Sequence, residues 1–184
     1  SKTGTVIFSD ISQDLLTHCR EVAEDLGVSD RCQFLRASAE DFSQVPDGSV
    51  SVVTTRSVLI YVHEKATAFR EFHRVLARGG RFSLFEPINS FGYPLPDHIF
   101  AGYDLAPIVN LALKVKALYR EAHPSDNDPM IDFDERDLLR FAQDAGFEQL
   151  HLRLEADIEP PKAELTWDAF LHRAPNPMAP TMDE

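Results

Sequence analysis

Apolar and polar positions follow two different periods along the chain, one typical of strands and one typical of helices. The apolar run VIF at positions 6–8 stops shortly before Asp10, and a short continuous run of β-formers is typical of a strand buried on both faces. From Ser12 to Gly27 the apolar residues recur every three or four positions. This spacing predicts a helix that Ser12 caps and that Gly27 ends in a left-handed conformation.

The same alternation of strand and helix continues along the chain. Apolar periodicity and turn residues predict strands over 32–37, 49–55 and 81–85, and helices over 65–77, ended by Gly79 and Gly80, and over 135–145, capped by Asp134. Residues 150–158 alternate between apolar and polar and predict a half-exposed strand at an antiparallel edge. Strands that alternate with helices predict an α/β fold with a mostly parallel sheet and helices on both faces.

The rhythm changes after Pro87. A loop rich in proline, glycine and aromatic residues spans 89–98, and an apolar helix is predicted near 99–121. We interpret residues 89–124 as a helical insertion into a single domain of residues 1–184. Its apolar face predicts either a lid over a small, partly hydrophobic molecule or the surface of a homodimer.

Composition narrows the classes of partner. The formal net charge is −12 and the basic residues are scattered, which argues against nucleic acid as a partner. No apolar run reaches the roughly 20 residues that span a bilayer, so we predict no membrane partner and a cytoplasmic protein. Cys19 and Cys32 stand in apolar segments without metal-ligand spacing, which predicts inert free thiols and no metal site.

Asp10 stands where a ligand is expected in such a fold. Ligands of open α/β sheets bind beyond the carboxyl ends of the strands, and a carboxylate there can accept hydrogen bonds from both hydroxyls of a ribose. The alternative is that Asp10 only caps the helix that follows, because aspartate is a common N-cap.

Four segments in this order resemble class I S-adenosylmethionine-dependent methyltransferases, which have a Rossmann-like sheet. They are VIFSDIS, FLRASAEDF, DGSVSVVTTRSVLIYV and FREFHRVLARGGRFSLFEP, and together they cover roughly Thr5 to Pro87. The resemblance implies S-adenosylmethionine as cofactor and methyl transfer to a small-molecule acceptor. The implied cofactor-binding residues are Asp10 at the ribose, Ile11 beside the adenine, Ser38 and Ala39 in the turn that brackets the adenine, and Thr55 or Arg56 near the methionine.

The resemblance also implies a first strand and a Gly-rich loop before Asp10, which this sequence does not contain. We therefore expect these residues to belong to a longer polypeptide. Methyl transfer is catalysed largely by alignment, and a protein base is optional. Candidates for a base or an acceptor contact, by position, are His63, His98, His123, Tyr61, Tyr103 and Glu86.

Two other functions stay open at this stage. Tyr61 and Lys65 have the Tyr-x-x-x-Lys spacing of the catalytic pair of NAD(P)-dependent short-chain dehydrogenases, and one helical turn would place the phenol beside the ammonium. The missing glycine loop alternatively fits a non-catalytic, methyltransferase-like binding domain.

Overall fold

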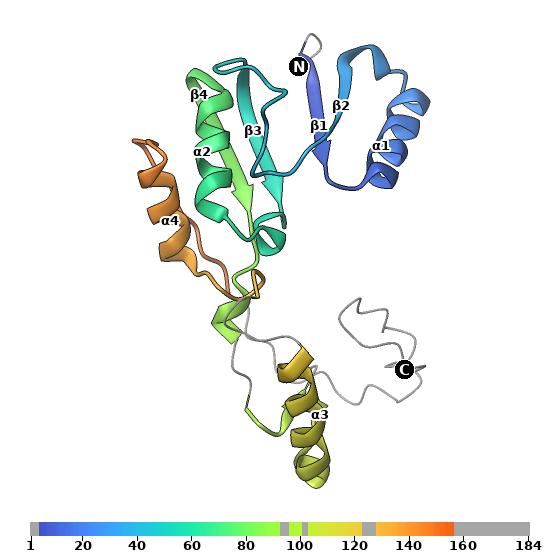
Figure 1. The fold of residues 1–184 in the computed structure, drawn as a ribbon, viewed down its shortest axis with the longest axis vertical. Helices are drawn as coiled ribbons and strands as arrows, with labels where there is room; N and C mark the ends of the chain where they lie inside the picture. Colours follow the sequence, from blue (N-terminus) through green and yellow to red (C-terminus); the bar gives the residue numbers. More distant parts are fainter. Residues whose placement is uncertain (1–3, 93–95, 101–102, 123–127, 157–184) are drawn as a thin grey trace. The chain divides into compact units, whose positions relative to one another are not determined.

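The computed structural model describes residues 4–92, 96–100, 103–122 and 128–156 (Figure 1). The chain divides into two compact units, one made of Ser1–Pro94 and Ala117–Arg153 and the other of Leu95–Lys116 and Leu154–Glu184. The prediction of a single domain stays a prediction, and the two units are described separately below.

The first unit contains two parallel strand pairs, each connected through a helix. Strand β1 (Val6–Asp10) pairs with β2 (Cys32–Arg36) across helix α1 (Gln13–Asp25). Strand β3 (Val50–Arg56) pairs with β4 (Leu76–Phe85) across helix α2 (Lys65–Val75). Both pairs are βαβ units, which confirms the predicted α/β class.

The strands are less buried than the sequence predicts. Val6 in β1 is 50 % exposed and Val52 in β3 is 61 % exposed. Within the described part of the chain, each strand is hydrogen-bonded to a neighbouring strand along one edge only. Neither β1 nor β3 is therefore an inner strand of a larger sheet there. The prediction that β1 is buried on both faces is therefore wrong for this structure.

Local capping signals place the helices where they are predicted. Ser12 is the N-cap of α1, and its hydroxyl accepts a hydrogen bond from Leu15 N at 3.3 Å. Asp134 caps α4 (Glu135–Asp144) in a capping box, in which the Asp137 carboxylate accepts from the Asp134 amide. Gly27 follows α1 with a φ of +65°, a left-handed conformation that glycine adopts without a steric penalty.

The end of α2 differs from the prediction. The helix ends at Val75, and Gly79 and Gly80 lie inside β4 instead of terminating the helix. The β3–β4 register shifts here, since Leu76 pairs with Val50 while Arg81 pairs with Val52. This shift is a β-bulge, and it requires glycine at both positions. Gly79 has a φ of +77°, and a Cβ at Gly80 would lie 2.8 Å from the Ala77 carbonyl oxygen.

The largest group of buried side chains lies in the first unit and joins α2 to its neighbours. Phe69 and Phe72 of α2 and Leu59 in the short 3₁₀ helix η2 (Leu59–Tyr61) are almost fully buried. Leu138 and Ala142 of α4 pack into the same cluster. The phenyl ring of Phe69 lies 5.9 Å from those of Phe72, Phe82 and Phe141.

The segment after Pro87 differs most from its prediction. It contains a 3₁₀ turn η3 (Asn89–Gly92), an antiparallel hairpin of β5 (Ile99–Phe100) and β6 (Tyr103–Asp104), a second turn η4 (Ala106–Ile108), and helix α3 (Val109–Ala122). The helix thus begins about ten residues later than predicted, because residues 99–100 pair instead with residues 103–104.

The predicted strand over 150–158 is wrong where it can be compared. Residues 151–156 form neither strand nor ladder, and residues 157 and 158 lie outside the described part. The only antiparallel pairing among the described residues is the β5–β6 hairpin. Cys19 and Cys32 are free thiols and half-buried. None of the described helices combines the length and hydropathy needed to cross a bilayer.

Candidate functional site

The end of β1 presents the carboxylate of Asp10 beside the end of β2. Asp10 pairs with Arg36 in the parallel ladder, and Ala37 N donates to the Asp10 carbonyl at 3.1 Å. One carboxylate oxygen, Oδ1, accepts from Ser12 N at 2.7 Å. No described residue is seen to donate to the other oxygen, Oδ2. Ser12, not Asp10, is therefore the helix cap, and Asp10 keeps one acceptor for a ligand.

An open hollow of about 320 Å³ lies at this edge. It is lined by Ile11, Arg36, Ala37 and Ser38. Ile11 is 67 % exposed, and the Arg36 guanidinium donates from Nε to the Ile11 carbonyl at 3.1 Å, which ties the two strand ends together. An exposed aliphatic side chain next to a partly satisfied carboxylate is suited to an apolar ring that carries a hydroxylated sugar.

The turn after β2 is held to the start of α2 by Glu40. Its Oε2 accepts from the Ser38 hydroxyl at 3.1 Å, and its Oε1 accepts from the Glu64 amide at 2.8 Å. Glu40 is half-buried. A simple solvated role, which its place in a charged run suggests, is therefore wrong for Glu40.

Thr55 and Arg56 lie at the carboxyl end of β3. The Thr55 hydroxyl donates to Glu86 Oε1 at 3.3 Å, and the Arg56 guanidinium lies 5.5 Å from the centre of the Phe85 ring. Glu86 also accepts from the amides of Val58 at 3.1 Å and Leu59 at 3.0 Å. The carboxylate at the end of β4 thus organises the turn that follows β3.

This turn contains the one described non-glycine residue with a positive φ. Ser57 has a φ of +53°, and its amide continues the β3–β4 ladder by donating to the Phe85 carbonyl at 2.8 Å. A left-handed serine costs about 1 kcal/mol. The hydrogen bonds that the Val58 and Leu59 amides donate to Glu86 offset this cost.

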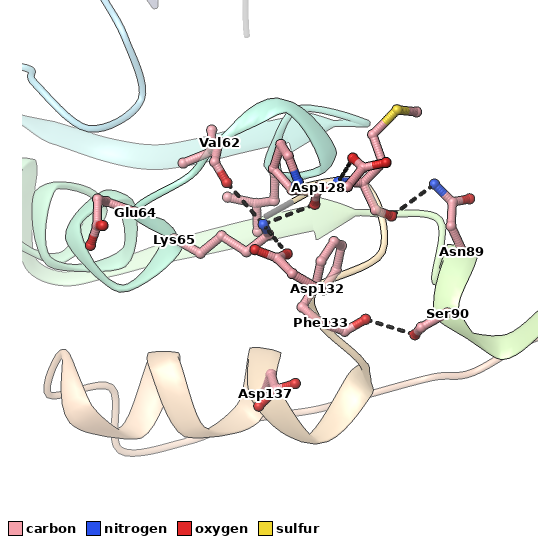
Figure 2. A network of polar contacts seen from close by, with 12 residues as sticks. Val62, Glu64, Lys65, Asn89, Ser90, Asp128, Asp132, Phe133 and Asp137 are labelled. Carbon is pink, nitrogen blue, oxygen red and sulfur yellow. Dashed lines mark hydrogen bonds and ion pairs between the residues drawn. The ribbon is translucent and has the colours of Figure 1, made fainter. Parts of the chain in front are cut away.

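Lys65 is buried in a polar network at the start of α2 (Figure 2). Its side chain is 2 % exposed, and Nζ donates to Asp132 Oδ1 at 2.5 Å, to Val62 O at 2.8 Å and to Pro129 O at 2.9 Å. An ammonium has three donors, so none is left for the phenol of Tyr61, which is 65 % exposed in η2. The geometry of the short-chain dehydrogenase pair is absent here.

Arg74, in the segment RVLARGG, clamps the chain between β2 and β3. Its guanidinium donates to Glu71, to Asp47 and to the carbonyls of Phe42 and Val45. The hydrogen bonds from Arg74 hold the pKa of Glu71 below its usual value, and the hydrogen bonds to Glu71 and Asp47 raise the pKa of Arg74. None of these partners is a predicted site residue, so the motif supports the fold.

The described candidate catalytic residues belong to two different units. His63 is exposed between η2 and α2 in the first unit. His98 is exposed in the second unit, where its carbonyl accepts from Leu105 N, and Tyr103 lies in β6. His123 lies outside the described residues. Among the described residues, no three His, Cys, Asp or Glu side chains come together as a metal site would require.

The structure therefore brings the predicted cofactor residues into two groups. Asp10, Ile11 and Ser38 lie together at the end of the β1–β2 ladder, and Ala39 is partly buried against the core. Thr55 and Arg56 lie at the end of the β3–β4 ladder. Their contacts with a cofactor stay predictions.

Sequence reasoning missed Glu40 and Lys65 as organising residues. Lys65 follows His63 and Glu64 at the start of the helix predicted over 65–77, so no local signal marks it as buried.

Comparison with known proteins finds similar domains and folds. The methyltransferase domain family matches residues 1–84. The ubiquinone/menaquinone biosynthesis C-methyltransferase UbiE of Escherichia fergusonii is 29 % identical over 161 residues, and that of Citrobacter koseri is 30 % identical over the same length. Each alignment covers 81 % of this chain and 59 % of the relative, so the chain spans less than two thirds of the length of these relatives.

Solved structures show the same fold. A proposed methyltransferase from Bacillus halodurans superposes with a TM-score of 0.53 and 22 % identity, over 77 % of this chain and 52 % of the other. The YcgJ protein of Bacillus subtilis superposes with a TM-score of 0.51 and 20 % identity, over 77 % and 51 % of the two chains. At these identities the likeness concerns the fold alone.

Proposed function

We infer that this chain belongs to the class I S-adenosylmethionine-dependent methyltransferases. On this premise we propose that the protein transfers a methyl group from S-adenosylmethionine to a small-molecule acceptor. The observation that carries the proposal is the hollow beside Asp10. It lies at the carboxyl ends of two parallel strands, where α/β sheets bind ligands. Its lining includes two of the residues that the resemblance assigns to the cofactor, Ile11 and Ser38.

The residues at this edge fit a nucleoside. Asp10 Oδ2 would accept a hydrogen bond from a ribose hydroxyl, while Oδ1 stays on the Ser12 amide. The side chain of Ile11 would cover one face of the adenine, and the backbone of the 37–40 turn would contact its edge. The turn after β3, held by Glu86, would meet the methionine portion.

The cofactor supplies a methyl group on a sulfonium: the acceptor atom forms a bond to the methyl carbon while the carbon–sulfur bond breaks, its electron pair staying on sulfur. The chain's contribution is to hold the two reactants in line, and good alignment alone is worth about 7–11 kcal/mol. A protein base is optional in such a reaction, because water can take the acceptor's proton.

For the acceptor we propose an electron-rich ring carbon. The relatives are named as C-methyltransferases of ubiquinone and menaquinone biosynthesis, and a hydroquinone ring carbon is nucleophilic because its hydroxyl groups donate electron density. The ring hydrogen then leaves as a proton. The cytoplasmic location predicted from the sequence stays a prediction.

Calorimetry with S-adenosylmethionine tests the donor site. We expect saturable binding to the wild-type protein and binding about 10–100-fold weaker in Asp10→Asn, since a hydrogen bond to a charged group is worth about 1.5–3 kcal/mol. Asp14→Asn is the matched control, because Asp14 is exposed in the first turn of α1. No saturable heat with the wild-type protein would overturn the proposal and favour a non-catalytic binding domain.

Transfer of a labelled methyl group to 1,4-naphthohydroquinone, kept reduced, tests the acceptor. Label on the ring carbon supports C-methylation. Label on a hydroxyl oxygen, or none, overturns the acceptor assignment without affecting the donor site. NADH in place of the sulfonium cofactor should give no saturable heat.

A further inference from the structure

The most completely bonded buried charge in the described structure lies outside the donor hollow. The Lys65 ammonium donates three hydrogen bonds, which are all that it has, and also lies 4.8 Å from the centre of the Phe133 ring. Two of its partners, Pro129 and Asp132, belong to the segment that leads into α4. The ammonium is buried while the Asp132 carboxylate is 35 % exposed; burying a charge is costly, so such an ion pair is weak evidence for a role in stability alone.

The same segment is bonded to the chain that leaves β4. Asn89 Nδ2 donates to the Met130 carbonyl at 3.1 Å, and the Ser90 hydroxyl donates to the Phe133 carbonyl at 2.7 Å. Figure 2 shows these two bonds beside the Lys65 contacts. Residues 89–90 and 130–133 are thus held together although about 40 residues separate them. We call residues 89–90, 129–133 and Lys65 the neck.

The neck marks both ends of the inserted segment. The first unit runs to Pro94 and resumes at Ala117, so the residues of the second unit from Leu95 to Lys116 lie in sequence between the two halves of the neck, residues 89–90 and 129–133. The neck is also close in sequence to the turn after β3 and to the carboxylate that holds it. Asn89 stands three residues after Glu86, and Lys65 stands four residues after η2.

We propose that Lys65 is a positioning residue that locks the root of the inserted segment against the turn after β3, and that through this lock it sets the affinity for the methyl acceptor. Lys65 does not contact substrate. Its three bonds fix the Val62, Pro129 and Asp132 positions, while the side chains of Asn89 and Ser90 fix the outgoing chain. The donor hollow, at the other ladder, shares no residue with the neck.

The acceptor part rests on the proposed function, so the test has two independent readouts. The first is hydrogen exchange followed by mass spectrometry on the full protein. In Lys65→Met we expect the amides of residues 128–133, including that of Ile131, which donates to the Asp128 carbonyl, to exchange about tenfold faster or more. Amides of β1 and β2 should keep their wild-type rates. Lys114→Met, at an exposed lysine of α3, is the control.

The second readout separates the two ligands. In Lys65→Met the dissociation constant for S-adenosylmethionine should stay within about twofold of wild type, while KM for 1,4-naphthohydroquinone rises about fivefold or more, as expected for lost positioning. Asp132→Asn, which keeps an acceptor but loses the charge, should shift KM in the same direction by less. If Lys65→Met does not fold, Asp132→Asn provides both readouts in its place.

Unchanged exchange of residues 128–133 in both folded variants would overturn the lock. Faster exchange with equal changes in both ligand affinities would overturn the role in acceptor binding. If the wild-type protein does not bind S-adenosylmethionine, the proposed function fails, and exchange alone then decides whether Lys65 locks the neck.

Discussion

Replacing Lys65 by methionine gives the sharpest test of the energetics of this structure. Methionine keeps an unbranched side chain of similar length, so the aliphatic packing is retained while the ammonium is lost. The change removes the ion pair to Asp132 and leaves the carbonyls of Val62 and Pro129 without this donor. Because Lys65 is 3 % exposed, water does not readily replace the lost donor.

The expected loss of stability can be summed over the three groups that lose their bond to Lys65. Each carbonyl deprived of its donor costs about 1 kcal/mol, the low end for an unsatisfied buried group, because a carbonyl has a second lone pair for another donor. Asp132 is 35 % exposed at its side chain and can rehydrate, so we assign only about 1 kcal/mol to the lost pair. Contact of the new thioether with Phe133 offsets the lost cation–π contact. The total is about 3 kcal/mol.

Urea denaturation followed by circular dichroism measures this change. Lys65→Met should lower the free energy of unfolding by about 3 kcal/mol, and Asp132→Asn alone by about 1 kcal/mol. In the Lys65→Met background, Asp132→Asn should cost almost nothing, which gives a coupling energy of about 1 kcal/mol. Lys114→Met should stay within about 0.5 kcal/mol of wild type. A loss below about 1 kcal/mol for Lys65→Met, or additive single changes, would refute the network as described.

Three further changes test other contacts. Glu86→Gln keeps one acceptor oxygen but loses the charge, so we expect about 1–2 kcal/mol of destabilisation in urea, and an equal effect of Glu148→Gln at an exposed position would contradict it. Glu71→Gln tests pH dependence: Arg74 lowers the pKa of Glu71 from its unfolded value of 4.5, so the stabilisation is present above pH 4.5 and is lost as the pH falls through the folded pKa. The wild-type and variant stabilities should therefore converge in acid, and a constant gap would show that the carboxylate does not titrate with folding. Ser57→Gly should raise the midpoint of thermal unfolding, because glycine relieves a positive φ at a cost in chain entropy; a lower midpoint would mean that the turn is not strained.

Local signals in the sequence were sufficient to predict most elements of the first unit. The start of α1 after Ser12 and the start of α4 after Asp134 depend on hydrogen bonds that span two or three residues. Such bonds form from neighbours along the chain, so the sequence contains the whole of the cause. The parallel βαβ units follow from the order of strand and helix in the same way.

The predicted strand over 150–158 and the early start of α3 went wrong for a shared reason. Alternating polarity predicts that a segment can pair, but pairing needs a partner strand, and within the described part of the chain no strand forms a ladder with residues 151–156. Residues 99–100, in contrast, pair with residues 103–104. Whether a strand forms is a property of two segments, and a single segment's pattern describes only one of them.

For the candidate site, the sequence by itself determined which residues end the strands: Asp10 and Ile11 after one, Ser38 after the next, Thr55 and Arg56 after the third. Only the tertiary structure decided that Glu40 and Glu86 hold the turns beside them, and that Lys65 is buried with Asp132, 67 positions away. In the sequence Glu86 is a candidate acceptor contact and Lys65 is half of a possible catalytic pair, and neither pattern shows the partners that these residues have in the fold. Their partners are backbone groups and side chains brought close by packing, and the free energy of a charge depends on the surroundings that folding creates.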